Sequence, residues 1–62
     1  MYGKVSRFEK GWGFILGDNG RRYYVSGGEI RVPSGILAVG SHVEFHPSVN
    51  DRGYAAKNVR PI

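Results

Sequence analysis

The chain has 62 residues, enough for one small domain, which we expect to span residues 1–62 with a core of only a few side chains. It contains no cysteine, which excludes a disulfide framework and a thiolate zinc site and fits a reducing cytoplasm, where we expect the protein. Nine Lys and Arg against five Asp and Glu give a net charge of +4, which suits a polyanionic partner and ordinary solubility equally well.

Short β-rich runs recur along the chain between turn signals, and no window has the spacing of an amphipathic helix. The first two strands are predicted over residues 4–8 (KVSRF) and 12–16 (WGFIL). Asn19-Gly20 then predicts a hairpin turn into a third strand over residues 21–26 (RRYYVS).

A long connection over residues 27–40 follows, in which SGILAVG (34–40) is expected to form a short helical turn against the core. A fourth strand is predicted over residues 41–46 (SHVEFH), and Pro47 is expected to end it because proline has no amide hydrogen for the ladder. NDRG then turns the chain into a fifth strand over residues 54–60. Five short strands with one long break predict an all-β fold, a small closed barrel.

The stretch KGWGFI places the only Trp and a Phe among glycines. Side chains alternate across a strand, so Trp12 and Phe14 share one face, while Gly11, Gly13 and Ile15 share the other. A barrel of this size holds few inward side chains, and the other strands and the long connection supply enough of them. The expected core is Val5, Ile15, Val25, Val43, Phe45 and Val59, capped by Ile30 and Leu37.

This assignment leaves Trp12, Phe14 and Tyr24 outside, near Lys4, Arg7 and Lys10. Exposed rings interleaved with basic side chains are typical of a platform on which unpaired bases stack. The same arrangement is also compatible with an apolar patch for a protein partner. Small inward glycines fit a strand that curls tightly beneath the rings.

The sequence gives little support to an enzyme, a metal site or a cofactor. His42 and His46 would face outward from one strand without further ligands, and Asp18 and Asp51 lie in turns. No apolar run is long enough to span a membrane, and the N-terminal residues lack an apolar signal segment. We therefore expect no catalysis, no metal or other cofactor, and no membrane partner.

Four ordered motifs resemble the bacterial cold-shock proteins and related cold-shock domains. GKVSRFEKGWGFI resembles the opening of that family, and its KGWGFI is similar to the first ribonucleoprotein motif. YYVSGGEI stands where the family has its second ribonucleoprotein motif, and LAVGSHVEF and DRGYAAKNV resemble its later segments. The resemblance is collinear from Gly3 to Val59, and implies a five-stranded antiparallel barrel of the OB type that binds single-stranded RNA or DNA.

The sequence departs from the family pattern within the implied site. Arg7 stands where the family has a tryptophan, and Ser26 and Gly27 replace a histidine and a phenylalanine, while Tyr24 keeps a ring. Arg7 is expected to contact phosphates, or to stack through its guanidinium plane. Loss of up to three rings also favours an alternative, a small regulator that reuses the barrel to bind a protein of the transcription or translation machinery.

The leading interpretation is therefore binding of single-stranded nucleic acid, as an RNA chaperone or as a regulator of transcription or translation. Tyr54 and Lys57 are added at the rim of the face, Tyr54 because it opens the fifth strand and Lys57 because of its positive charge. The expected binding residues are Lys4, Arg7, Phe8, Lys10, Trp12, Phe14, Tyr24, Ser26, Tyr54 and Lys57.

Overall fold

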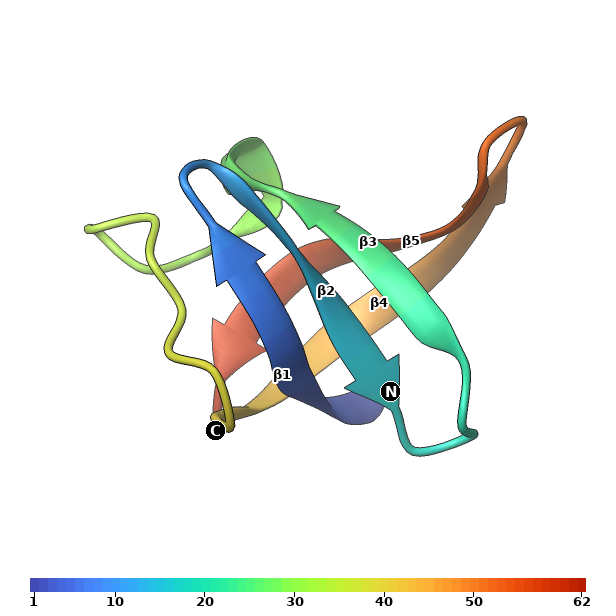
Figure 1. The fold of residues 1–62 in the computed structure, drawn as a ribbon, viewed down its shortest axis with the longest axis horizontal. Coiled ribbons are helices and arrows are strands. Elements are labelled where there is room, and N and C mark those ends of the chain that lie inside the picture. Colours follow the sequence, from blue (N-terminus) through green and yellow to red (C-terminus); the bar gives the residue numbers. More distant parts are fainter.

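The computed structural model describes residues 1–62, which form five strands and one turn of 3-10 helix. Figure 1 shows β1, β2 and β3 side by side in front, with β4 and β5 crossing behind them. The structure has no helix whose length and apolar character would let it cross a membrane. The elements are β1 (Tyr2–Glu9), β2 (Trp12–Gly17), β3 (Arg22–Ser26), η1 (Gly27–Glu29), β4 (His42–Asn50) and β5 (Gly53–Pro61).

The strands close into a barrel in the order β1-β2-β3-β5-β4, which confirms the predicted all-β architecture. Neighbouring strands run antiparallel except β3 and β5, which meet in parallel at Tyr24 and Ala55. Closure pairs every strand with a neighbour on both sides over part of its length, which shortens the exposed edges that would otherwise favour aggregation. The parallel contact also brings the start of β5 beside Tyr24, on the outside of the barrel.

The core contains the side chains that strand alternation predicted. Tyr23 is also buried, with its ring 5.1 Å from that of Phe45 between centroids, and its hydroxyl accepts a hydrogen bond from Asn19 Nδ2. The polar end of this residue therefore has a partner although the ring lies inside. The predicted core residues, all buried, are Val5, Ile15, Val25, Ile30, Leu37, Val43, Phe45 and Val59, and they are joined by Tyr23, Ala55 and Ala56.

A β-bulge at Ser6 reverses the alternation of β1. Val5 pairs with Ile15, but Arg7 rather than Ser6 pairs with Phe14, so β1 contains one extra residue. The Ser6 hydroxyl donates a hydrogen bond to the Phe14 carbonyl at 3.3 Å, which helps to hold the bulge. As a result, Arg7 points outward, whereas strict alternation would have placed it on the same side as Val5.

The expected end of the fourth strand at Pro47 is wrong. β4 continues to Asn50, and Pro47 pairs with Ala56 of β5. The backbone amide of Phe45 still bonds the Met1 carbonyl, but β4 has only β5 as a neighbour beyond that point. A strand with one free side tolerates a residue that lacks an amide hydrogen.

Two local expectations also need correction. Residues 34–40 form no helical turn; the single 3-10 turn is η1, although Leu37 from this segment does cap the core. Gly11 does not lie on the inner face of a strand. It occupies the turn between β1 and β2 with a φ of 83°, in the left-handed region that favours glycine.

Candidate nucleic-acid interface

Three aromatic side chains form a continuous row on the outside of β2 and β3. Trp12 and Phe14 alternate along β2, and Tyr24 of β3 is the cross-strand partner of Phe14. The ring centroids of Trp12 and Phe14 are 5.8 Å apart, and those of Phe14 and Tyr24 are 5.9 Å apart, both in edge-to-face geometry. This geometry is favourable for aromatic pairs and fixes the three rings relative to one another. We call these rings and their outward cross-strand neighbours on β1–β3 the aromatic face.

Gly13 supports the aromatic face from within. It is buried between the two outward rings, and its cross-strand partner on β1 is Phe8. A Cβ atom added at Gly13 would meet the Arg7 carbonyl oxygen and would lie 2.8 Å from Cδ1 of Phe8. The glycine therefore lets β1 and β2 approach closely while both neighbouring residues of β2 present rings outward, as the sequence predicted.

Guanidinium groups lie over two of the three rings. The Cζ atom of Arg7 is 5.3 Å from the centroid of Trp12, and the Cζ atom of Arg22 is 5.3 Å from the centroid of Phe14. These separations lie within the range of cation–π attraction. Arg7 also forms an ion pair with Glu9, from Nε to Oε2 at 3.0 Å, whereas Arg22 forms none. The aromatic face is thus a mixed surface of rings and planar cations.

Three further cations around the row have no ion-pair partner. Lys4 is exposed on β1 beside Leu16, Lys10 is exposed in the turn between β1 and β2, and Arg52 is exposed in the turn between β4 and β5. An unpaired surface cation keeps its whole charge available to an anion. Such charges, placed at the edges of a row of rings, match the arrangement of phosphates around stacked bases.

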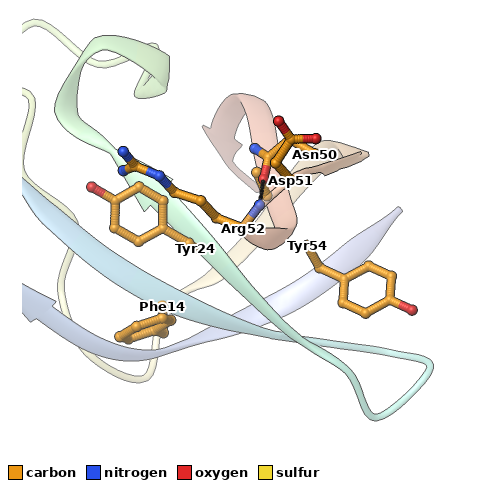
Figure 2. Close-up of a pocket in the computed structure, with 7 residues that line it drawn as sticks. Phe14, Tyr24, Asn50, Asp51, Arg52 and Tyr54 are labelled. Atoms are coloured by element: carbon orange, nitrogen blue, oxygen red, sulfur yellow. Dashed lines mark hydrogen bonds between the residues drawn. The ribbon is translucent and has the colours of Figure 1, made fainter.

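The hairpin between β4 and β5 adds a groove at the Tyr24 side of the row. Phe14 and Tyr24 form one wall, and the hairpin residues Asn50 to Arg52 form another. In Figure 2 the Arg52 side chain extends back from the hairpin in the direction of Tyr24. The Arg52 amide donates to Asn50 Oδ1 at 2.9 Å, which stabilises the turn from which this side chain projects.

Tyr54 lines the same groove but is held by a different set of contacts. Its ring lies 5.8 Å from that of Tyr23, and the Cζ atom of Arg21 lies 4.5 Å from its centroid. Arg21 Nη1 also donates a hydrogen bond to the Tyr54 hydroxyl. Figure 2 shows the Tyr54 ring pointing away from Tyr24, so it extends the groove rather than the row itself.

The remaining expected residues divide into one near the row and two away from it. Ser26 is the cross-strand partner of Trp12 and lies at the end of the row. Phe8 faces inward, partly buried against the core beneath the aromatic face, because the Ser6 bulge turns it there. Lys57 pairs through Nζ with Glu29 Oε2 at 3.7 Å, beside Arg31 rather than beside the rings. We therefore leave Phe8 and Lys57 out of the proposed interface.

Sequence reasoning missed three residues of the surface. Arg22 lies two residues before Tyr24 in β3 and therefore on the same face, so strand alternation alone was enough to find it. Glu9 reaches the aromatic face only through the bulge at Ser6, which the sequence does not signal. Arg52 lies far from the row in sequence and reaches it through the pairing of β3 with β5. No group of three or more His, Asp or Glu side chains is placed to hold a metal ion.

No protein-family model matches the sequence, and no curated protein matches it. Among solved structures, the chain is similar to the cold-shock domains of Drosophila Unr (CSD456), with a TM-score of 0.77 over 98% of this chain and 17% sequence identity. The chain spans about a quarter (26%) of that structure's chain. At this identity the likeness concerns the path of the backbone. The chain therefore has the cold-shock-domain form of the OB barrel.

Proposed function

We propose that the chain binds single-stranded RNA or DNA on the aromatic face and in the groove beside it. The observation that carries this proposal is the row of Trp12, Phe14 and Tyr24, held edge to face on the outside of the barrel. Large rings normally lie in the core, and here a full core leaves them outside. Trp12 and Phe14 are half-buried and Tyr24 is exposed, and a row of rings on the outer surface presents faces on which successive unpaired bases stack.

Each group in the interface has a defined part in this proposal. The three rings stack on bases, and every base has a face that can stack, so binding tolerates many sequences. Lys4, Lys10 and Arg52 lie around the row without acid partners and contact phosphates. Ser26 offers a hydroxyl beside Trp12, and Tyr54 closes the far end of the groove.

Sequence-tolerant binding of single strands suits two cellular roles. A protein that holds unpaired bases opposes intramolecular pairing of RNA, which is the action of an RNA chaperone, and it can regulate transcription or translation in the same way. We expect either role to be exercised in the cytoplasm. The cold-shock-domain fold supports this proposal by analogy, since a fold by itself does not determine a function.

Binding of a protein partner is the second candidate function, and one observation favours it. Leu16 and Val39 are 48% and 64% exposed and line a shallow groove with Lys4, next to the aromatic face. Exposed aliphatic side chains beside a ring surface are typical of protein contacts. A small regulator that docks on a protein of the transcription or translation machinery would use this part of the surface.

Titration of Trp12 fluorescence separates the two functions. The ligands are a single-stranded RNA, a single-stranded DNA and a duplex of the same length, each tested at two salt concentrations. We expect both single strands to bind more tightly than the duplex, because pairing hides the faces of the bases. Equal affinity for duplex and single strand would indicate charge attraction alone. Absence of binding at low salt would contradict the proposal and leave the protein partner as the remaining candidate.

A further inference from the structure

Arg7 is the one cation of the aromatic face that an acid holds in place. Its Nε donates to Glu9 Oε2 at 3.0 Å, and its Cζ atom lies 5.3 Å from the centroid of Trp12. Glu9 is the cross-strand partner of Trp12, so the carboxylate stands beside the ring that the guanidinium overlies. The hydrogen bond and the ring together limit where the guanidinium can go.

Arg22 provides a direct comparison within the same surface. Its Cζ atom is also 5.3 Å from a ring centroid, that of Phe14, but no carboxylate pairs with it. Arg22 can therefore leave its ring and pair with a phosphate. The Nη groups of Arg7 stay free while its Nε is bonded to Glu9, but a phosphate drawn toward them would also approach the negative charge of Glu9.

We propose that the guanidinium of Arg7, held over Trp12 by Glu9, is a stacking surface for an unpaired nucleobase rather than a phosphate contact. The inference rests on the proposed function, since it assigns a role within the same interface. A guanidinium is planar and stacks on bases as aromatic rings do. The Arg7 side chain is 59% exposed, so it is available to a ligand while its Cζ atom lies 5.3 Å from the centroid of Trp12.

The bulge at Ser6 makes this arrangement possible. It turns Arg7 outward and aligns Glu9 with Trp12, so that cation, acid and ring meet on one surface. In this arrangement Glu9 is a positioning residue that acts through Arg7. The base would stack on the exposed part of this guanidinium, at the Trp12 end of the row.

The test compares Arg7→Ala, Arg7→Lys and Glu9→Ala with Arg22→Ala and Arg22→Lys. The affinity of each protein for oligo(dT) is measured by fluorescence anisotropy of the labelled oligonucleotide over a series of salt concentrations. Arg7→Ala should bind roughly 5- to 100-fold more weakly at low and high salt alike, with an unchanged slope of log affinity against log salt. Arg7→Lys should not restore binding, because lysine has the charge but no plane.

The other variants should behave differently. Arg22→Ala should reduce the magnitude of the salt slope by about 0.7, as expected for one lost phosphate contact on a single strand, and Arg22→Lys should restore it. At high salt the repulsion between Glu9 and the phosphates is screened, so its removal brings no gain in affinity. Under these conditions Glu9→Ala should weaken binding, because the guanidinium is no longer held over Trp12. In the ligand-free protein, Arg7→Ala should make Trp12 more accessible to the neutral quencher acrylamide.

Several results would overturn the inference. If Arg7→Lys binds as well as the wild type, or if Arg7→Ala reduces the salt slope, Arg7 is a phosphate contact. If Arg7→Ala binds more tightly, the guanidinium covers the ring and competes with bases. Unchanged high-salt affinity in Glu9→Ala would refute the positioning role. If the wild-type protein binds oligo(dT) but none of the Arg7 variants differs from it, only this inference fails; if the wild type does not bind, the proposed function fails with it.

Discussion

Replacing Phe14 by alanine is the most direct test of the aromatic row. Phe14 lies at its centre, in edge contact with Trp12 at 5.8 Å and with Tyr24 at 5.9 Å between centroids. It also lines both the groove toward the β4–β5 hairpin and the shallow depression beside Arg22. Phe14→Ala removes one stacking surface and leaves the other two rings without their shared neighbour.

The expected loss of affinity follows from these contacts. One stacked base contributes about 1–3 kcal/mol by alanine substitution, and Phe14 also orients two neighbouring rings, so we expect about 2 kcal/mol or more. This corresponds to a dissociation constant that is about 30-fold higher. The slope of log affinity against log salt should stay unchanged, because no charge is removed. Trp12 remains in this variant and reports binding of a single-stranded oligonucleotide by its fluorescence.

Two controls make the Phe14 experiment decisive. Leu16→Ala removes an exposed aliphatic side chain from the same face of β2, and it should change the affinity by less than about twofold because it offers no ring. Circular dichroism of both variants checks that the barrel remains folded. Equal losses in the two variants would mean that the surface binds by general apolar contact. No loss in Phe14→Ala would refute base stacking on this row.

Two other substitutions test the support and the charge of the interface. Gly13→Ala should destabilise the barrel by about 1–3 kcal/mol, because the added Cβ would meet the Arg7 carbonyl and lie 2.8 Å from Cδ1 of Phe8. Thermal denaturation should show a fall of at least about 4 °C in Tm, and an unchanged Tm would mean that β1 and β2 can separate at no cost. Arg52→Gln should reduce the magnitude of the salt slope for single strands by about 0.7, because its charge has no partner in the protein. An unchanged slope would exclude Arg52 from the phosphate contacts.

Strand alternation, read from the amino-acid sequence, is enough to assign which side chains fill the barrel and which rings stay outside it. β2 and β3 are regular, so strand alternation assigned Ile15 and Val25 to the core and Phe14 and Tyr24 to the outer face. In the structure Ile15 and Val25 are buried, Tyr24 is exposed and Phe14 is half-buried. Alternation is a local property of an extended backbone and needs no knowledge of the neighbouring strands. The inward position of Gly13 followed from the same pattern, whereas the close approach of β1 that it permits is seen only in the structure.

The pairing of the strands sets where this alternation is broken and which distant residues join the face. The bulge at Ser6 turns Arg7 and Glu9 outward and Phe8 inward, because one extra residue in β1 must be accommodated against the register of β2. Pro47 remains inside a strand because β4 has only one neighbour at that point. Arg52 reaches the groove only through the closure of β3 against β5. Each of these outcomes depends on which backbone lies alongside which, and that is a property of the closed barrel rather than of any local stretch of sequence.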